Sequence, residues 1–286
     1  MDRRESNTQI FRDTERRCKS EKKLIDAIMK SNQGQYIVYE NETIPTIKEH
    51  RYSEPVKVTV SGKRSLEAAA GYREYKVCVH NFASATNPGG GVVRGASAQE
   101  EAICRCSTLY FNINEPGVAK NFHDKHRNDI RAGKMNALYN DDCIFTPAVY
   151  VLKSDTAEPE LLPEKDWYQV DVITCAAPNL RNRPSNSMNP NAGTNAVRVT
   201  DKELMDLHVK RMSRICDLAI KEQEEVLILG AFGCGAFCNE PRVVAEAMAR
   251  IVDKYKFDFK IIEFAVYCSS WDTKNYDVFS KRLGRK

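Results

Sequence analysis

A run of three glycines shortly before two adjacent glutamates is the part of this sequence best suited to chemistry. The run consists of Gly89, Gly90 and Gly91. Without Cβ atoms, its backbone can adopt left-handed angles and lie directly against a ligand. The spacer VVRGASA separates the run from Gln99, Glu100 and Glu101, which open a segment with helical spacing of apolar residues. A glycine-rich surface with paired carboxylates at its rim suits the cleavage of a glycosidic or ester bond.

A simpler explanation of Glu100 and Glu101 is that they only stabilise the start of a helix. The helix dipole favours acids there by about 0.3–1 kcal/mol each. The three glycines and Asn87-Pro88 just upstream favour a functional role instead. Two adjacent carboxylates repel each other, which raises the pKa of one of them, whereas the helix dipole lowers it. We therefore expect a neutral acid only where a bound substrate desolvates the pair or adds its own negative charge.

A second glycine-rich loop, GAFGCGAFCNEP, follows an apolar strand pattern and precedes a helix pattern. Its amide groups could hold a diphosphate beside the helix N-terminus. It lacks the lysine of a Walker sequence and the spacing of the dinucleotide fingerprint, and a tight strand-to-helix turn explains it equally well on its own. The aromatic residue after the glycines favours ligand binding, because it can pack on a ribose or base. The candidate binding residues are Gly233, Cys234, Gly235, Ala236 and Phe237.

Other reactive side chains give weaker signals. His123 and His126, with Asp124 between them, have the spacing of a helical metal pair, but their neighbours NFHDKHRND indicate a solvated helix, so we predict no metal. His80 ends a predicted strand and is expected to be packed. Serine hydrolase chemistry has no support, because the sequence has no G-x-S-x-G elbow. Cys234 has no identified base partner, so we interpret it as a small loop residue rather than a nucleophile.

Composition restricts the function further. The chain of 286 residues has 43 basic and 39 acidic side chains and a net charge of +4, which does not indicate a nucleic-acid binder. Its ten cysteines are scattered and form no C-x-x-C pair. Because the sequence also shows no signal-peptide pattern, we expect a reducing intracellular location, cytoplasmic or nuclear. No apolar run approaches the ~20 residues of a membrane span, so we expect no membrane partner.

Alternating strand and helix patterns must position these motifs. Thr200 and Glu203 have the spacing of a capping box at a helix start. Apolar strands that alternate with helices imply a largely parallel sheet covered on both faces, and ligands bind at the carboxyl ends of such strands. Both glycine loops follow strands, so we expect them to be neighbours in space. The aperiodic stretch 179–199 is predicted to be a long loop. We predict strands over 76–80, 143–152, 170–177, 226–232 and 261–267, and helices over 99–112, 200–222 and 240–254.

The beginning of the chain has a different character. We predict that residues 1–74 form an N-terminal helical and strand extension packed on a single globular core over 75–286. Within the extension we expect a frayed start and an amphipathic helix over 18–29. Short β-type runs at 36–39 and 56–60 are predicted to be peripheral strands.

The order of the motifs resembles the poly(ADP-ribose) glycohydrolases, and within them the shorter microbial type built on a macrodomain. The resemblance rests on the glycine run followed by QEE, on DVITCAAPN at 171–179 and on LILGAFGCGAFCNEP at 227–241, and it extends from about residue 75 onward. It implies a macrodomain-like three-layer α/β/α fold with a mixed, largely parallel sheet. It also implies exo-type hydrolysis of ribose–ribose O-glycosidic bonds in poly(ADP-ribose), which releases ADP-ribose without a metal or other cofactor.

The resemblance assigns roles to the motif residues. Glu101 would protonate the leaving ribose oxygen and then activate water, and Glu100 would fix the hydroxyls of the ribose under attack. The run from Gly89 to Gly91 would contact the diphosphate or the terminal ribose, with Gln99 beside it. The second loop, through Gly233, Cys234, Gly235, Ala236 and Phe237, would hold the diphosphate and the adjoining ribose from the opposite side.

The sequence departs from the family in two places. Longer members carry an asparagine after a Phe-Ala pair, whereas here Phe82-Ala83 is followed by Ser84, and we assign the contact to the nearest asparagine, Asn87. The aromatic residue that sandwiches adenine in larger members has no counterpart in this sequence. The contact with the base therefore stays open.

Two alternatives also stay open. One is a macrodomain reader that binds ADP-ribose and cleaves nothing, and the other is a mono-ADP-ribosyl hydrolase acting on protein or nucleic acid. The paired glutamates argue against a pure reader, which has no use for two carboxylates facing a diphosphate. The expected substrate is poly(ADP-ribose) or ADP-ribosylated protein, and the expected product is ADP-ribose.

Overall fold

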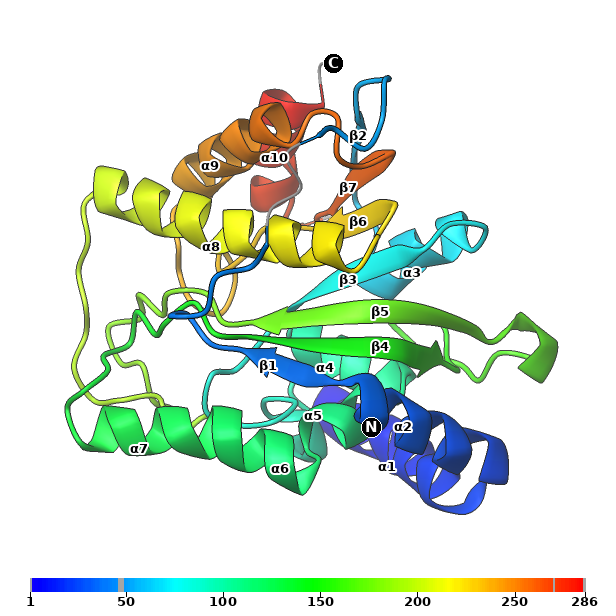
Figure 1. The fold of residues 1–286 in the computed structure, drawn as a ribbon. Coiled ribbons are helices and arrows are strands. Elements are labelled where there is room, and N and C mark those ends of the chain that lie inside the picture. Colours follow the sequence, from blue (N-terminus) through cyan, green and yellow to red (C-terminus); the bar gives the residue numbers. More distant parts are fainter. Residues whose placement is uncertain (1, 46–48, 270, 285–286) are drawn as a thin grey trace.

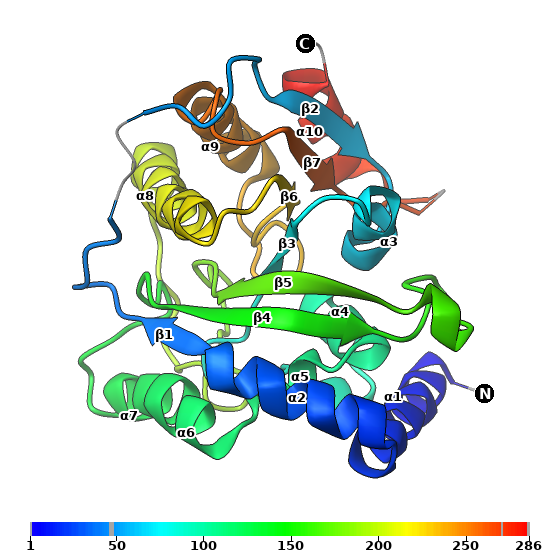
Figure 2. The ribbon, with the colours of Figure 1, turned by 45° about the vertical axis from the view of Figure 1, so that its right-hand side comes forward.

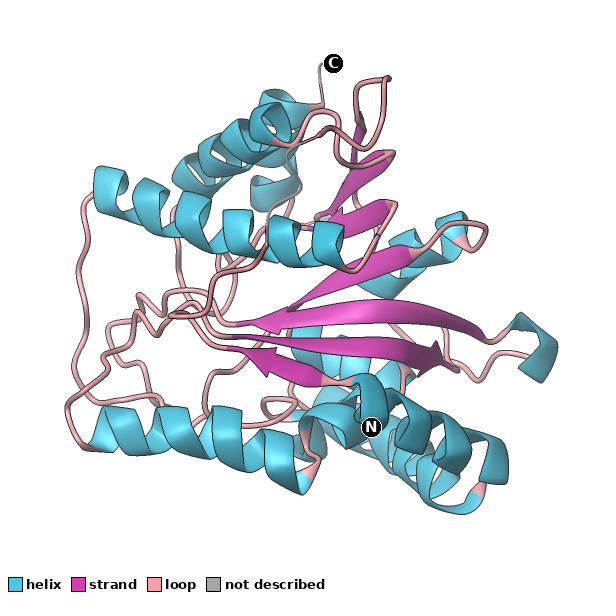
Figure 3. Ribbon diagram, in the orientation of Figure 1, coloured by secondary structure: helices cyan, strands magenta, loops and turns pink. Residues whose placement is uncertain are grey.

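One mixed sheet organises the molecule. The computed structural model describes residues 2–45, 49–269 and 271–284, and within them seven strands follow the order β1-β4-β5-β3-β6-β7-β2. Helices cover both faces of this sheet (Figure 1, Figure 3). The strands are β1 Tyr36–Val38, β2 Lys57–Ser61, β3 Val77–Phe82, β4 Cys143–Val151, β5 Tyr168–Cys175, β6 Val226–Leu229 and β7 Ile261–Ala265. The helices are α1 Arg3–Ser20, α2 Lys22–Gly34, α3 Ser65–Ala69, α4 Gln99–Cys106, α5 Leu109–Ile113, α6 Pro116–Val118, α7 Lys125–Arg131, α8 Asp201–Lys221, α9 Pro241–Lys254 and α10 Lys274–Leu283, with a π-helical turn at Ala119–Asp124 before α7.

The strand directions bring the predicted functional loops to one edge. β3 pairs in parallel with β5 and β6, β6 pairs in parallel with β7, and β7 pairs in parallel with β2. Only β4 runs against the others among the described strands, because it is antiparallel to both β5 and β1. The predicted mixed, largely parallel sheet is therefore confirmed. Its parallel strands end together at one edge, where ligands of such sheets bind.

Side chains alternate across the sheet and build two apolar layers. Cys78 of β3 faces the layer covered by α8, α9 and α10, and the next residue, Val79, faces the layer that contains α3, α4 and α5. Figure 1 shows α8, α9 and α10 on one side of the sheet and α4 and α5 on the other. The predicted three-layer α/β/α arrangement is confirmed. The predicted capping box also forms, because the Thr200 hydroxyl accepts from the backbone N–H of Glu203 while the Glu203 carboxylate accepts from Thr200.

The N-terminal residues are more ordered than expected. The very start, where fraying is expected, includes residue 1, which lies outside the described residues; α1 begins at Arg3 and buries Phe11 against the sheet layer. The single helix expected over 18–29 is wrong, because the extended backbone of Glu21 separates α1 from α2. Figure 2 shows α2 running along β1 and β4. The peripheral strands are confirmed, as β1 and β2 form the two edges of the sheet, while the division at residue 74 stays a prediction.

Two other expectations concern the segments around the site. The helix predicted over 99–112 is wrong as one element, because α4 ends at Cys106 and α5 starts at Leu109. Ser107 is extended and bridges to Val151 of β4, which interrupts the helical hydrogen bonds. The long loop is confirmed, since the described residues 179–199 contain no helix or strand. No helix among the described residues is long and apolar enough to cross a membrane.

A buried carboxyl group lies at the start of β6, whereas the glycine loops lie at the carboxyl ends of β3 and β6. Glu224, just before β6, is 0% exposed, and the ammonium of Lys76 lies 3.3 Å from its Oε1. Burial, reinforced by the charge of Asp171, raises the pKa of Glu224 to about 10 despite this ammonium. Its carboxyl group is therefore protonated in the folded protein at neutral pH. Because the unfolded chain releases that proton near pH 4.5, Glu224 makes the free energy of unfolding fall as pH rises from there towards 10.

We expect Glu224→Gln to stabilise the protein, and more strongly at pH 9 than at pH 6. Glutamine keeps the shape of the neutral acid and removes the need to bind a proton, which costs up to about 1.4 kcal/mol for each pH unit above the ordinary pKa of 4.5. Thermal unfolding at both pH values measures it. The matched control is Glu225→Gln, because Glu225 is paired with Lys260 at 2.6 Å and its pKa is lowered. An equal or smaller gain at pH 9 would contradict the assignment of the proton to Glu224.

Candidate active site

Both glycine loops open onto one cavity of about 720 Å³. The glycine run lies between β3 and α4, and the second loop lies between β6 and α9. The expectation that the two loops are neighbours in space is therefore confirmed. The predicted site residues that line the cavity are Gly90, Gly91, Gln99, Glu100, Glu101, Gly233, Gly235, Ala236 and Phe237.

Glu100 is fixed by donors at the end of β3. It lies in the first turn of α4 and is only 2% exposed. Its Oε1 accepts from the Asn81 side-chain amide at 3.2 Å, and its Oε2 accepts from the backbone N–H of Ser84 at 2.8 Å. Burial raises the pKa of the Glu100 carboxyl well above its usual range, and the charge of Glu101 adds to the rise. Glu100 is thus both rigidly held and reluctant to ionise.

Glu101 is fixed by the glycine run. It is 7% exposed, and its Oε1 accepts from the backbone N–H of Gly91 at 2.9 Å. A Cβ atom at Gly90 would lie 3.0 Å from the carboxyl carbon of Glu101, so only glycine lets the backbone come this close. Burial raises the pKa of Glu101, although the Gly91 N–H and the charge of Arg105 oppose the rise. The glycines therefore position the carboxylates as well as opening the backbone to a ligand.

We expect the activity of the protein to fall at the alkaline end of its pH range, and at a higher pH than an ordinary glutamate would cause. Because the pKa values of Glu100 and Glu101 are both raised, the pair keeps a proton at pH values where an ordinary glutamate has lost it. A general acid is then available until the pair ionises fully, after which kcat/KM declines. Rates of product release measured from pH 5 to pH 10 test this, with ADP-ribose affinity measured over the same range as the control. A kcat/KM that rises throughout this range would contradict a protonated carboxyl in the pair.

Gln99 holds the strand end rather than pointing freely into the cavity. Its side-chain nitrogen donates to the His80 carbonyl at 2.8 Å and to the Ser65 hydroxyl at 3.0 Å, and its oxygen accepts from the Phe82 N–H at 2.9 Å. It therefore ties the start of α4 to β3 and α3. Its predicted contact with substrate stays a prediction.

The second loop has the shape of a tight turn with an open surface. Gly233 adopts a left-handed φ of +78°, and a Cβ there would lie 2.8 Å from the Ala177 Cβ. The Asn239 side chain braces the turn by donating to the carbonyls of Gly233 and Phe237. At Gly235, in contrast, no described atom lies within 4 Å of the Cβ position. The backbone at Gly235 is therefore accessible to a ligand.

The thiol of Cys234 lies outside the cavity lining. It packs against the apolar layer under the loop, and burial raises the pKa of the thiol far above its usual range. A nucleophilic thiolate is therefore disfavoured at this position. Its predicted contact with substrate, which its backbone could still make, stays a prediction.

The long loop over 179–199 forms one wall of the cavity. Its Asn189 side-chain oxygen accepts from the Asn87 amide at 2.9 Å and from the Thr86 hydroxyl at 2.7 Å. Met188 lies next to Gly91, where its Cβ is 3.2 Å from the position of an added Cβ. Asn87 is thus held against this wall, and its predicted ribose contact stays a prediction. The loop residues that line the cavity are Arg181, Pro184, Asn186, Met188 and Asn189.

Sequence reasoning missed the far side of the cavity. Arg64 and Asp155 line it there, and the Arg64 guanidinium stacks 4.0 Å from the ring centroid of Tyr267. Among the described residues, Asp155 Oδ1 is buried without a hydrogen-bond partner. These side chains come from three distant segments and belong to no motif, so the sequence carried no signal for them. The beginning of α1 also lines the cavity through Arg3, Arg4 and Asn7.

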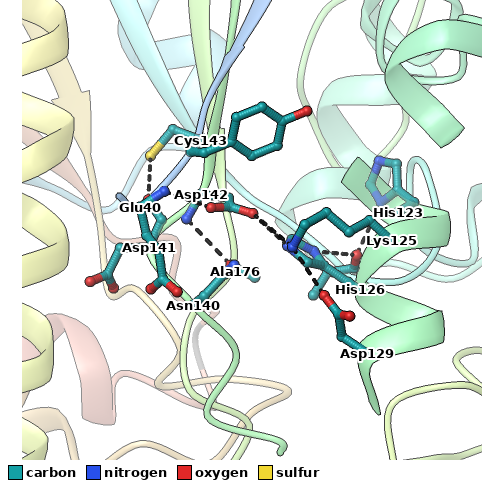
Figure 4. Close-up of polar contacts among 12 residues, drawn as sticks. Glu40, His123, Lys125, His126, Asp129, Asn140, Asp141, Asp142, Cys143 and Ala176 are labelled. Atoms are coloured by element: carbon teal, nitrogen blue, oxygen red, sulfur yellow. Dashed lines mark hydrogen bonds and ion pairs between the residues drawn. The ribbon is translucent and has the colours of Figure 1, made fainter. Parts of the chain in front are cut away.

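The interpretation of the histidines as part of a solvated helix is wrong. His123 and His126 are both buried, because their ring nitrogens turn inward to the carbonyl of Ala85. Figure 4 shows His126 and Lys125 facing Asp142. His80 is packed as expected, and burial lowers its pKa to about 3. Within the described parts of the chain, no group of three or more His, Cys, Asp or Glu side chains is arranged to hold a metal ion.

The three-layer α/β/α sandwich is a macrodomain-like fold. The two glycine loops and the buried carboxylate pair around one cavity are features of a hydrolase built on that fold. The model of the microbial-type PARG catalytic domain, PARG being poly(ADP-ribose) glycohydrolase, matches residues 5–154, which is slightly more than half of the chain. The chain belongs to this family. No curated protein sequence matches it.

The chain is also similar to solved structures of bacterial poly(ADP-ribose) glycohydrolases. The poly(ADP-ribose) glycohydrolase from Thermomonospora curvata is 25% identical, with a TM-score of 0.79 over 98% of this chain and 100% of that one. The poly(ADP-ribose) glycohydrolase from Deinococcus radiodurans, in complex with ADP-ribose, is 27% identical, with a TM-score of 0.73 over 90% of this chain and 97% of that one. The similarity therefore covers the N-terminal elements as well as the motifs.

Proposed function

We propose that this protein hydrolyses the ribose–ribose O-glycosidic bonds of poly(ADP-ribose) and releases ADP-ribose, with Glu101 as general acid and base. Membership of the microbial-type family supports the activity. The observation that carries the assignment is the buried Glu100–Glu101 pair facing a cavity shared with both glycine loops. Glycoside hydrolysis needs a positioned acid of raised pKa, and the burial of this pair supplies one.

The proposed roles follow from the contacts of each carboxyl group. The Glu101 carboxyl group, whose Oε1 accepts from the Gly91 N–H, lines the cavity and is proposed to protonate the leaving ribose oxygen. After the bond breaks, the same carboxylate takes a proton from a water molecule, whose oxygen forms the new bond to the anomeric carbon. Glu100, held at both oxygens by Asn81 and Ser84, is better suited to orient ribose hydroxyls than to transfer protons. The negative charge of the substrate's own diphosphate would also stabilise the oxocarbenium-like transition state.

The remaining motif residues are proposed to hold the substrate. We assign the diphosphate and the adjoining ribose to the second loop, through the exposed backbone of Gly235 and the ring of Phe237, with Gly233, Cys234 and Ala236 shaping the turn. The terminal ribose is assigned to the glycine run Gly89–Gly91, with Asn87 and Gln99 supporting it. The fit of a diphosphate to glycine-loop amides next to a helix start supports the first assignment.

The reader alternative is weakened by the cost of the carboxylate pair. Burying two adjacent acids raises both pKa values, and a protein that only binds an anionic ligand gains nothing from them. The mono-ADP-ribosyl hydrolase alternative differs from the proposal only in substrate. Incubation with poly(ADP-ribose) and, side by side, with singly modified protein tests all three. The proposal expects ADP-ribose from the polymer, and a polymer that is bound but left intact would overturn it.

Two further proposals concern the molecule as a whole. We propose an intracellular location, cytoplasmic or nuclear, and the ten free cysteines support it because such thiols persist in a reducing compartment. We also propose that residues 1–74 are an extension packed on a catalytic core over 75–286. The motif residues that we assign to the reaction all follow residue 75 in the sequence.

A further inference from the structure

The short segment 83–88, between β3 and the glycine run, is held by hydrogen bonds from the helical region 119–131 that follows α6. The Ala85 carbonyl accepts a hydrogen bond from His126 Nδ1 at 3.1 Å and faces His123 Nδ1 at 3.3 Å. The next carbonyl, that of Thr86, accepts from the Arg127 guanidinium at 2.5 Å. Three side chains of one helical region therefore hold two successive peptide groups.

His126 is itself held from behind. Its Nε2 lies 3.0 Å from Asp142 Oδ2 and its Nδ1 faces the Ala85 carbonyl, so both ring nitrogens have a polar partner. Both side chains are buried, at 1% and 2% exposure. Burial would raise the pKa of Asp142, but the hydrogen bonds from His126 and from the Glu40 N–H lower it, so its carboxylate is ionised. Lys125 Nζ lies 4.0 Å from the same carboxylate oxygen, Asp142 Oδ2.

The segment 83–88 carries donors and acceptors that reach both catalytic candidates. The Ser84 N–H, one residue before the clamped carbonyl, donates to Glu100 at 2.8 Å. The Asn87 carbonyl accepts from the Gly90 N–H at 2.9 Å, and the adjacent Gly91 N–H donates to Glu101. A shift of the peptide at Ala85 would thus move the partners of Glu100 directly and those of Glu101 through the turn.

We propose that His126, backed by Asp142, is a positioning residue for the glycosidic cleavage. By fixing the Ala85 carbonyl it aims the Ser84 N–H at Glu100 and sets the glycine run against Glu101. The inference rests on the proposed function for its catalytic consequence. Small displacements of catalytic groups cost far more in rate than in ligand affinity, because the diphosphate contacts of the second loop stay in place.

The test uses the full chain with two separate variants, Asp142→Asn and His126→Gln. For each variant kcat of ADP-ribose release, the Kd of ADP-ribose, the melting temperature and the NMR position of the Ser84 amide are measured. We expect kcat to fall about tenfold or more while the Kd changes by less than about threefold, and we expect the Ser84 amide resonance to move. The matched control is the pair formed by the exposed His50 and the partly buried Asp258, 3.5 Å apart and outside the cavity lining; changed in the same way to Gln and Asn, it should alter none of these values.

Each outcome decides the inference. A kcat within about twofold of wild type in both variants overturns it, and so does a joint loss of kcat, ligand affinity and melting temperature, which marks a purely structural pair. Wild-type protein that releases no ADP-ribose from polymer overturns the proposed function instead. In that case the Ser84 amide still decides whether the histidine positions this segment, since an unmoved resonance in both variants refutes it.

Discussion

Replacement of Glu101 by glutamine should lower kcat for ADP-ribose release by about a thousandfold or more, while the Kd for ADP-ribose changes by less than about threefold. Loss of a positioned general acid typically costs 10²–10⁴ in rate. Glutamine has the same shape, and its side-chain oxygen can still accept from the Gly91 N–H. The cavity and its binding loops therefore stay intact. Single-turnover rates on polymer and calorimetric titration with ADP-ribose measure the two effects separately.

The control for this change is Glu74→Gln, because Glu74 is exposed and lies outside the cavity lining. It should leave both rate and affinity unchanged. Turnover retained in the Glu101 variant would remove this residue from the mechanism. A variant that loses ADP-ribose binding in parallel with turnover would assign Glu101 to substrate binding instead.

Gly90→Ala should be nearly as damaging, although it adds only a methyl group. The new Cβ would overlap the Glu101 carboxylate and lie 3.2 Å from Glu100 Oε2, so both acids must move. Displacement of catalytic groups on this scale costs about 100-fold in kcat. Gly90 also has a left-handed φ of +57°, where a side chain costs about 1–2 kcal/mol of stability. Kinetics and thermal unfolding of the same preparation measure the two losses.

Gly71→Ala is the matched control for the glycine change. No described atom lies within 4 Å of the Cβ position at Gly71, and its φ is not left-handed. This variant should keep wild-type kcat and stability. Wild-type kcat in the Gly90 variant would show that the carboxylates do not depend on the close approach of this backbone.

The sequence was sufficient to place the two glycine loops together, because the rule for parallel strands needs only the order of strands and loops. It also predicted the burial layers, since wholly apolar strands such as that over 226–229 must be covered on both faces. The candidate carboxylate pair was identified from its short distance along the chain to the glycine run. Local patterns and the order of the strands thus sufficed to predict these features.

Contacts between distant segments were beyond this kind of reasoning. Arg64 and Tyr267 stack on each other in the cavity lining from positions about two hundred residues apart, and no periodicity connects them. The histidines were misassigned because charged neighbours suggested solvent on all sides, whereas one face of the helical region packs on Ala85. The break between α4 and α5 likewise depends on a bridge from Ser107 to Val151. Tertiary partners override local propensity in each case.

The pairing of β2 with β7 affects how the chain can fold during its synthesis. Lys57 of β2 pairs with Ile261 of β7, so this edge of the sheet can form only after residue 261 has left the ribosome. Until then, β2 has no strand to pair with. Such distant pairing slows folding and leaves hydrophobic intermediates exposed, so we expect yield to depend strongly on temperature and on chaperone supply.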